Sequence, residues 1–247
     1  MIKDELQNTE IIDGTGKNMD LIAGGGGYGW TEKWGQEIID KEIVSRLEPD
    51  DVVVDLCSGE GRVTMPFAMR GTKVIAVDLN EKRIKEGDEL RENAGARKVD
   101  KMIQDVKKLT REKLNGEATI LIAGDSLNHF TKKDADKFIN NISKLLNPNK
   151  RGLIYINVPA TESINFQHFE SFSAKKLDER TLEVECDCSG ELKKEPIPFY
   201  SKGELQAMLA LQGANILAVK EMERNGVGLL HEVVAQFKPK TDDIKGS

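Results

Sequence analysis

The stretch that decides the fold is Asp51–Asn80, DVVVDLCSGEGRVTMPFAMRGTKVIAVDLN. It opens with an apolar run, residues 52–54, of the kind that is buried on both faces of a parallel sheet. A glycine turn and a helix follow, and Gly71 suits the left-handed position that ends a helix. A second apolar run, residues 73–77, leads to Asp78, where a carboxylate would grip a ribose diol in a doubly wound sheet. The pattern predicts a nucleoside-binding βαβ unit.

The glycine turn between these two predicted strands differs from a dinucleotide-binding turn. A dinucleotide fingerprint has a third glycine, which allows close packing of helix and strand, but here Val63 and Thr64 follow Gly61. An acidic residue, Asp55, stands at the head of the turn. Its carboxylate would repel a pyrophosphate and attract a cationic amino-acid group. The turn therefore favours a ligand that carries such a group.

The turn resembles motif I of the class I S-adenosylmethionine-dependent methyltransferases, D-L-x-C/S-G-x-G-R. The matching residues are Asp55, Leu56, Ser58, Gly59, Gly61 and Arg62, with Cys57 where many relatives have the first motif glycine. Four later stretches resemble further motifs of the family in the family's order: residues 74–80, 102–106, 118–130 and 150–157. The resemblance covers about residues 45 to 238. One such motif alone is weak, but five in order are specific.

The resemblance implies S-adenosylmethionine as the cofactor and S-adenosylhomocysteine as the product. It assigns the positions around the methionine part of the cofactor to Asp55, Cys57, Gly59 and Gly61. The positions at the ribose and adenine are Asp78, Leu79, Asp105 and Val106. Those near the methyl-bearing sulfur are Ala123 and Leu127. Each carboxylate alone has an ordinary alternative as a strand-end or turn residue. Three of them at three successive strand ends favour one site.

The remaining elements alternate as in a doubly wound α/β fold. The sequence predicts helices at about residues 31–47, 62–71, 80–95, 131–147 and 201–213, with Thr131 as a cap and Ser201 and Glu204 as a capping box. Two last strands, about 215–222 and 230–237, should form a hairpin at the sheet edge. We expect a seven-stranded, mostly parallel sheet, the Rossmann-like methyltransferase fold, with a small antiparallel β lid.

Three parts of the chain are expected. These are an N-terminal segment and cap helix (1–47), the S-adenosylmethionine-binding domain (48–238) and a tail (239–247). Within the domain, residues 159–200 form an insertion in which apolar and polar residues alternate from Leu182 to Cys188, which predicts a strand. A return strand is expected over 192–200 and the start of a third over 164–169. In relatives of this type such strands cover the substrate pocket, so the insertion is interpreted as a substrate lid.

The residues that would serve the methyl acceptor carry weaker signals. His129 lies in the loop after the predicted fourth strand and could accept a proton near neutral pH. The alternative is a histidine that hydrogen-bonds the start of the following helix. His168, in the predicted lid, is a weaker candidate for the same proton-accepting role. Three aromatic residues are candidates to close over the cofactor: Tyr28, Trp30 and Trp34. The three aromatic ones serve equally well as anchors of a packed helix.

Two residue groups have metal-binding chemistry but poor spacing. Cys186 and Cys188 have no second cysteine pair, and Asp125 with His129 has no evident third ligand. We therefore expect no metal. A glycine run at 24–27 has no strand before it and no Gly-Lys-Ser/Thr after it, so it is interpreted as a hinge and not a phosphate loop.

Composition limits the partners. Lys and Arg number 36 against 42 for Asp and Glu, a net charge of −6, which argues against a duplex-binding surface. Three cysteines without framework spacing suit a reducing compartment. The opening MIKDELQNTE lacks the apolar core of a signal peptide, and no segment approaches the roughly 20 apolar residues of a membrane span. We expect a cytoplasmic protein without nucleic-acid or membrane partners.

The function expected is transfer of a methyl group to a nitrogen or oxygen of a small molecule by in-line displacement. An RNA or protein methyltransferase is the alternative within the class, although residues 124–127 lack the Asn-Pro-Pro-Tyr pattern of nucleic-acid enzymes. Two alternatives come from other classes. The missing third glycine and the presence of Asp105 count against an NAD-dependent oxidoreductase, and the elaborated lid counts against a non-catalytic nucleoside-binding module.

Overall fold

The structure is a computed structural model, and it describes residues 36–61, 63–93, 99–163, 174–187, 192–224 and 228–240. Several predictions lie outside these ranges: those for Tyr28, Trp30, Trp34, Arg62, His168, Cys188, the glycine run 24–27, the tail and the strand expected at 164–169. They stay predictions.

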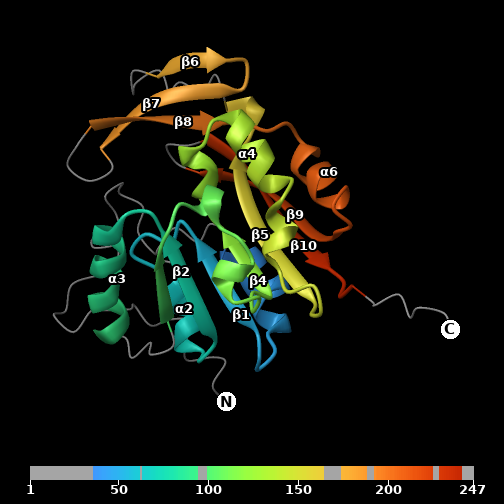
Figure 1. Cartoon of the computed structure of the whole chain (residues 1–247). Helices are drawn as coiled ribbons and strands as arrows, with labels where there is room; N and C mark the ends of the chain where they lie inside the picture. Colours follow the sequence, from blue (N-terminus) through green and yellow to red (C-terminus); the bar gives the residue numbers. More distant parts are fainter. Residues whose placement is uncertain are drawn as a thin grey trace.

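A seven-stranded sheet in the order β3-β2-β1-β4-β5-β10-β9 forms the centre of the molecule (Figure 1). Its strands are β1 Val52–Leu56, β2 Lys73–Asp78, β3 Val99–Ile103, β4 Ile120–Ala123, β5 Gly152–Pro159, β9 Asn215–Arg224 and β10 Gly228–Phe237. The first five are parallel, and β10 runs antiparallel to both β5 and β9. The predicted doubly wound sheet with a terminal hairpin is confirmed. Strand order reverses between β1 and β4, and ligands bind beyond the strand ends at such a switch point.

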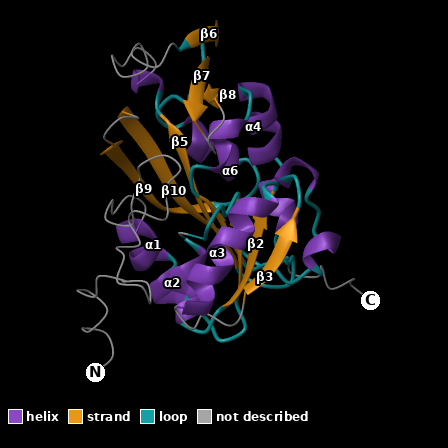
Figure 2. Ribbon diagram, turned by 90° about the vertical axis from the view of Figure 1, so that its left-hand side faces the viewer, coloured by secondary structure: helices purple, strands orange, loops and turns teal. Residues whose placement is uncertain are grey.

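Helices cover both faces of the sheet (Figure 2). They are α1 Gln36–Glu42, α2 Thr64–Met69, α3 Glu81–Asn93, α4 Lys132–Ile139 and α6 Glu204–Ala210, with 3-10 turns η3 Val44–Arg46, η4 Val106–Lys108, η5 Glu112–Leu114, η6 Ser126–His129, η7 Ile142–Leu145 and η8 Thr161–Ser163. Helices α1 and α2 pack on one face, where Phe67 is 1% exposed, and α4 and α6 pack on the other. Burying a side chain of this size stabilises the fold by roughly 1.5–3 kcal/mol. No helix in these described ranges is long and apolar enough to cross a membrane.

Four helices differ from their predicted bounds. The one expected over 31–47 ends at Glu42 as α1, and the 3-10 turn η3 follows it. The one expected over 131–147 begins after a Thr131 cap as predicted, but α4 ends at Ile139, and a 3-10 turn follows because Asn141 leaves the helical conformation. Helix α2 begins at Thr64 rather than at 62. The capping box expected at Ser201 and Glu204 is only half formed: the Glu204 carboxylate accepts from the Ser201 N–H over 3.1 Å. Gly203, with φ +83°, precedes the first helical residue, and the Ser201 hydroxyl donates to the Glu204 carboxylate instead of accepting from the helix.

The insertion folds as a separate antiparallel sheet of β6 Lys175–Asp178, β7 Thr181–Asp187 and β8 Leu192–Pro198. The alternating strand and its return strand are therefore confirmed, and the described third strand is β6. The chain leaves the end of β5 to form this sheet and returns beside it, where Ala160 and Tyr200 form a bridge. Strand β8 contacts η6 and α4. The small sheet thus lies beyond the carboxyl end of β5, against the loop that follows β4 (Figure 1).

An ion-pair cluster joins the small sheet to the helices. Glu204 of α6 binds Arg180, in the turn between β6 and β7, and lies 3.0 Å from Lys132 Nζ of α4. The same Nζ lies 4.2 Å from the centre of the buried Tyr200 ring, a cation–π contact. These contacts therefore attach the small sheet to helices α4 and α6.

Candidate active site

The turn after β1 is left-handed at three positions. Cys57 has φ +57°, Gly59 +53° and Gly61 +94°. Glycine adopts such angles freely, whereas they cost a residue with a side chain roughly 1–3 kcal/mol. Cys57 therefore occupies a backbone position suited to the first glycine of the motif that this turn resembles, and it carries the strain of that position.

The carboxylate at the end of β2 is bound to this turn. The Gly59 N–H donates to Asp78 Oδ2 over 2.8 Å, and the Asn80 N–H donates to Oδ1 over 2.8 Å. Asp78 is half-buried, and Leu79 beside it is 69% exposed. An acceptor group with an exposed apolar neighbour is a suitable surface for a ribose and its base.

A second link across the same turn was missed by the sequence analysis. Arg83 of α3 donates from Nε and Nη2 to the two carboxylate oxygens of Glu60, over 2.8 and 2.7 Å. A Cβ added at Gly59 would lie 2.8 Å from that Nη2 atom. The glycine is therefore favoured by its backbone angle, and a side chain at this position would have to push the end of Arg83 aside. No spacing signal connects Glu60 to Arg83, which are 23 residues apart.

Two polar side chains of the turn are buried. Asp55 is 3% exposed and accepts a hydrogen bond from Thr64 Oγ1 over 2.6 Å, so its carboxylate also holds the start of α2. Ser58 is 8% exposed, and its hydroxyl has no hydrogen-bond partner among the described residues. A buried unsatisfied hydroxyl costs about 1–3 kcal/mol. The turn therefore suits a ligand with a polar group to offer Ser58.

The loops after β3 and β4 approach the same edge of the sheet. Asp105 Oδ1 accepts from the Lys107 N–H over 2.9 Å, and Val106 is 5% exposed. Ala123 and Leu127 are fully buried on either side of the turn after β4. The structure thus brings all ten sequence-predicted cofactor residues to the carboxyl ends of β1, β2, β3 and β4.

The β4 loop is tied to the glycine turn. Ser126 Oγ donates to the Leu56 carbonyl over 2.6 Å, and Cys57 Sγ lies 3.8 Å from the Ser126 carbonyl. Burial raises the pKa of the Cys57 thiol to about 12, and the charges of Asp78 and Asp55 add to the effect. The thiol is therefore protonated at neutral pH and serves packing, not nucleophilic chemistry.

A second buried contact holds the residue before Ser126. Asp125 has φ +55°, and its N–H donates to Asn157 Oδ1 over 2.7 Å. The Asn157 Nδ2 lies 3.5 Å from Asp125 Oδ1. Asn157 is 2% exposed at the end of β5. The sequence analysis did not single it out, although an asparagine in an otherwise apolar strand was a usable signal.

The predicted catalytic histidine lies on the surface. His129 is the last residue of η6 and is exposed. The side chain that caps the following helix is that of Thr131, which accepts from the Asp134 N–H. Among the described residues no three His, Cys, Asp or Glu side chains gather closely enough to hold a metal ion.

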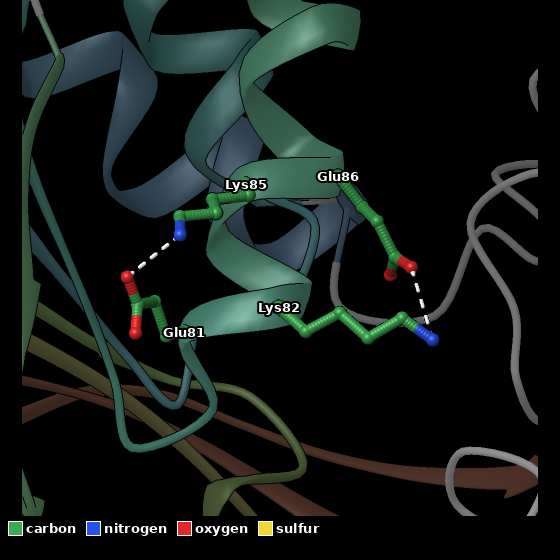
Figure 3. Close-up of a pocket in the computed structure, with 4 residues that line it drawn as sticks. All are labelled: Glu81, Lys82, Lys85 and Glu86. Carbon is green, nitrogen blue, oxygen red and sulfur yellow. Dashed lines mark ion pairs between the residues drawn. The ribbon is translucent and has the colours of Figure 1, made fainter.

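A surface hollow lies on α3, the helix that follows β2 (Figure 3). It is lined by Glu81, Lys82, Lys85 and Glu86. Glu81 pairs with Lys85 at 2.8 Å and Glu86 with Lys82 at 3.7 Å. Exposed pairs one helical turn apart contribute a few tenths of a kcal/mol each, so we interpret this face as helix stabilisation.

Part of the chain is similar to a known protein family. Residues 53–149 match the profile of a family described as a methyltransferase domain. The match runs from β1 to the residues before β5 and includes all of the predicted cofactor positions.

Solved structures share the fold. An S-adenosylmethionine-dependent methyltransferase from Methanosarcina mazei superposes with a TM-score of 0.63 at 16% identity, covering 79% of this chain and 96% of that one. The 1,6-didemethyltoxoflavin-N1-methyltransferase of Burkholderia thailandensis, solved with its substrate and S-adenosylhomocysteine, gives 0.58 at 19% identity, covering 85% and 80%. The magnesium protoporphyrin IX methyltransferase of Synechocystis, with bound cofactor, gives 0.55 at 15% identity, covering 81% and 76%.

One curated relative matches in part. A tRNA (guanine(37)-N(1))-methyltransferase from Phytophthora infestans is 35% identical over 74 residues, which are 30% of this chain and 17% of that protein's length. Residues 53–149 are therefore similar to a methyltransferase domain, and the chain shares the fold of solved S-adenosylmethionine-dependent methyltransferases.

Proposed function

We propose that the chain transfers the methyl group of S-adenosylmethionine to a nitrogen or oxygen of a small molecule. The observation that carries the proposal is the hydrogen bond between the Gly59 N–H and Asp78, because it joins the glycine turn and the β2 carboxylate into one cradle. The buried Ser58 hydroxyl, which has no hydrogen-bond partner among the described residues, fits a nucleoside that carries polar amino-acid groups.

The residues of the cradle have separate roles in this proposal. Asp78 accepts hydrogen bonds from the ribose hydroxyls, and Leu79 covers the base. Asp105 and Val106 meet the adenine edge, while Ser58 and the glycine turn hold the methionine end. Ala123 and Leu127 exclude water near the sulfur. The bound cofactor supplies an activated methyl group on a sulfonium sulfur.

Methyl transfer then depends on how the acceptor atom is positioned. A displacement needs the acceptor atom in line with the carbon–sulfur bond, and orienting two reactants in this way can supply on the order of 7–11 kcal/mol of the barrier. In the proposal the small sheet, which contacts η6 through β8, covers the acceptor as a lid. His129, which is exposed on η6, remains a candidate base for a hydroxyl acceptor.

The acceptor class is supported by two facts. The net charge of −6 disfavours a long polyanionic acceptor. One structural neighbour is by name an N-methyltransferase of a small heterocycle. The partial tRNA methyltransferase relative supports the rival proposal of an RNA acceptor. One assay that offers both kinds of acceptor can distinguish the two proposals.

The test is formation of S-adenosylhomocysteine by the purified chain. One set of reactions contains small amines and hydroxyl compounds, and another contains total tRNA. Turnover with a small molecule and none with tRNA supports the proposal. Turnover with tRNA alone would replace the small-molecule acceptor with RNA and leave the cofactor assignment intact.

A further inference from the structure

We propose that the Asp125 carboxylate binds the acceptor nitrogen, so that the site selects amines over alcohols. This inference rests on the proposed function and goes beyond it by naming the acceptor class. The sequence suggested Asp125 only as a poorly spaced metal ligand.

The place of Asp125 is next to the predicted methyl-bearing end of the cofactor. Its neighbour Ser126 is hydrogen-bonded to Leu56 over 2.6 Å and contacts Cys57, and both partners belong to the end of β1 and its glycine turn. The Asp125 side chain is itself only partly buried, and it precedes η6, the turn that β8 of the small sheet contacts. Asp125 therefore lies between the cofactor cradle and the lid.

The Asp125 backbone has a strained, left-handed conformation that a neighbouring side chain stabilises. A residue other than glycine with φ +55° persists only where its surroundings impose that conformation. The imposing group is Asn157, which is 2% exposed and accepts the Asp125 N–H over 2.7 Å. Strain of this kind gathers at functional sites, and Asp125 lies in the short loop between β4 and η6.

Asn157 also orients the carboxylate. Its Nδ2 lies 3.5 Å from Asp125 Oδ1, so the amide contacts both the backbone and the side chain of one residue. We assign Asn157 as a positioning residue and Asp125 as the group that touches the acceptor. A carboxylate accepts hydrogen bonds only, and a charge-assisted bond to an amine is stronger than a neutral one.

The proposed methyl transfer to an amine conserves atoms and charge. The neutral amine nitrogen forms a bond to the methyl carbon, and the carbon–sulfur bond breaks, leaving its electron pair on a neutral thioether sulfur. The product nitrogen becomes a cation and then releases one proton, through Asp125 or directly to water. The carboxylate thus favours an acceptor that gains positive charge in the transition state.

The test uses two cofactor analogues and needs no knowledge of the acceptor. Sinefungin carries an amine where S-adenosylmethionine carries its methyl group, whereas S-adenosylhomocysteine has no group there. Calorimetric titration of the wild type should give at least about tenfold tighter binding of sinefungin. In Asp125→Asn, which tolerates the left-handed backbone, this preference should vanish while S-adenosylhomocysteine binds as before.

Two further variants separate the carboxylate from the fold. Asp125→Gly keeps the backbone angle without strain and should lose the preference to the same extent. Glu162→Gln removes an exposed carboxylate of η8 and should keep it. An unchanged preference in both Asp125 variants, or no preference in the wild type, overturns the inference. If S-adenosylhomocysteine fails to bind the wild type, the proposed function falls and this inference with it.

Discussion

Gly59 and Asp78 are joined by a hydrogen bond of 2.8 Å, from the backbone N–H of one to the carboxylate of the other. Gly59 lies in the turn after β1 and Asp78 is the last residue of β2, 19 residues further along the chain. The bond fixes the distance between the turn assigned to the methionine end and the carboxylate assigned to the ribose. The two halves of the proposed cofactor site therefore form one rigid unit.

Asp78→Ala should lower affinity for S-adenosylhomocysteine at least about tenfold, because hydrogen bonds to a charged group contribute roughly 1.5–3 kcal/mol each. Calorimetric titration measures the effect, and circular dichroism checks that the fold is intact. Asp78→Asn is the matched control, since it keeps the shape and loses the charge. Affinity equal to that of the wild type in Asp78→Ala would remove Asp78 from the site.

Gly59→Ala should destabilise the chain by roughly 1–3 kcal/mol, because alanine disfavours φ +53°. The added Cβ would also lie 2.8 Å from Arg83 Nη2. Urea unfolding measures the loss. In the double variant with Arg83→Ala the collision is absent but the backbone strain remains, so only part of the stability should return. Full recovery would show that φ costs nothing here.

Cys57 offers a test of backbone strain at the first position of the turn. Cys57→Val should destabilise by roughly 1–3 kcal/mol, since a β-branched side chain is least compatible with φ +57°. Cys57→Gly should stay within about 1 kcal/mol of the wild type, because relief of strain offsets the packing lost with the thiol. Unfolding free energies in urea compare the two. Equal stability of both variants would contradict the strain account.

Glu204 should make the anchoring of the small sheet depend on pH. Burial raises the pKa of Glu204, but hydrogen bonds from Arg180 and Lys132 outweigh it and lower the pKa from 4.5 to about 2. Because the folded-state pKa is below the unfolded one, this stability is present above pH 4.5 and is lost as the pH falls toward 2.

Glu204→Gln should therefore lower the free energy of unfolding near neutral pH, and its difference from the wild type should shrink at about pH 3. Urea titrations at the two pH values measure this. Glu81→Gln, which breaks an exposed pair within α3, is the control and should change stability by less than about 0.5 kcal/mol at neutral pH. A difference for Glu204→Gln that is independent of pH would refute the ion-pair account.

The sequence predicted the parts of the fold that depend on local pattern. The apolar runs of β1 and β2, the glycine turn between them and the alternation in β7 each carry a signal within a few residues. Helix ends were less accurate. The break after Ile139 and the start of α6 at Glu204 depend on the backbone angles of Asn141 and Gly203, which apolar periodicity does not encode.

The site was predicted as positions and not as contacts. The Arg83–Glu60 pair joins residues that no motif relates, and Asn157 meets Asp125 only because β5 lies beside β4 in the sheet. Such contacts follow from the strand order, so they become visible only in the folded chain. The left-handed angle of Cys57 was partly accessible, because the residue stands in a motif position that many relatives give to glycine.

The most direct test of the central claim is calorimetric titration of the wild-type chain with S-adenosylmethionine, S-adenosylhomocysteine and NAD. The account predicts micromolar binding of the first two, on the order of 8 kcal/mol, and no heat from NAD. Binding of NAD alone would contradict the assignment of the glycine turn and of Asp78 to S-adenosylmethionine.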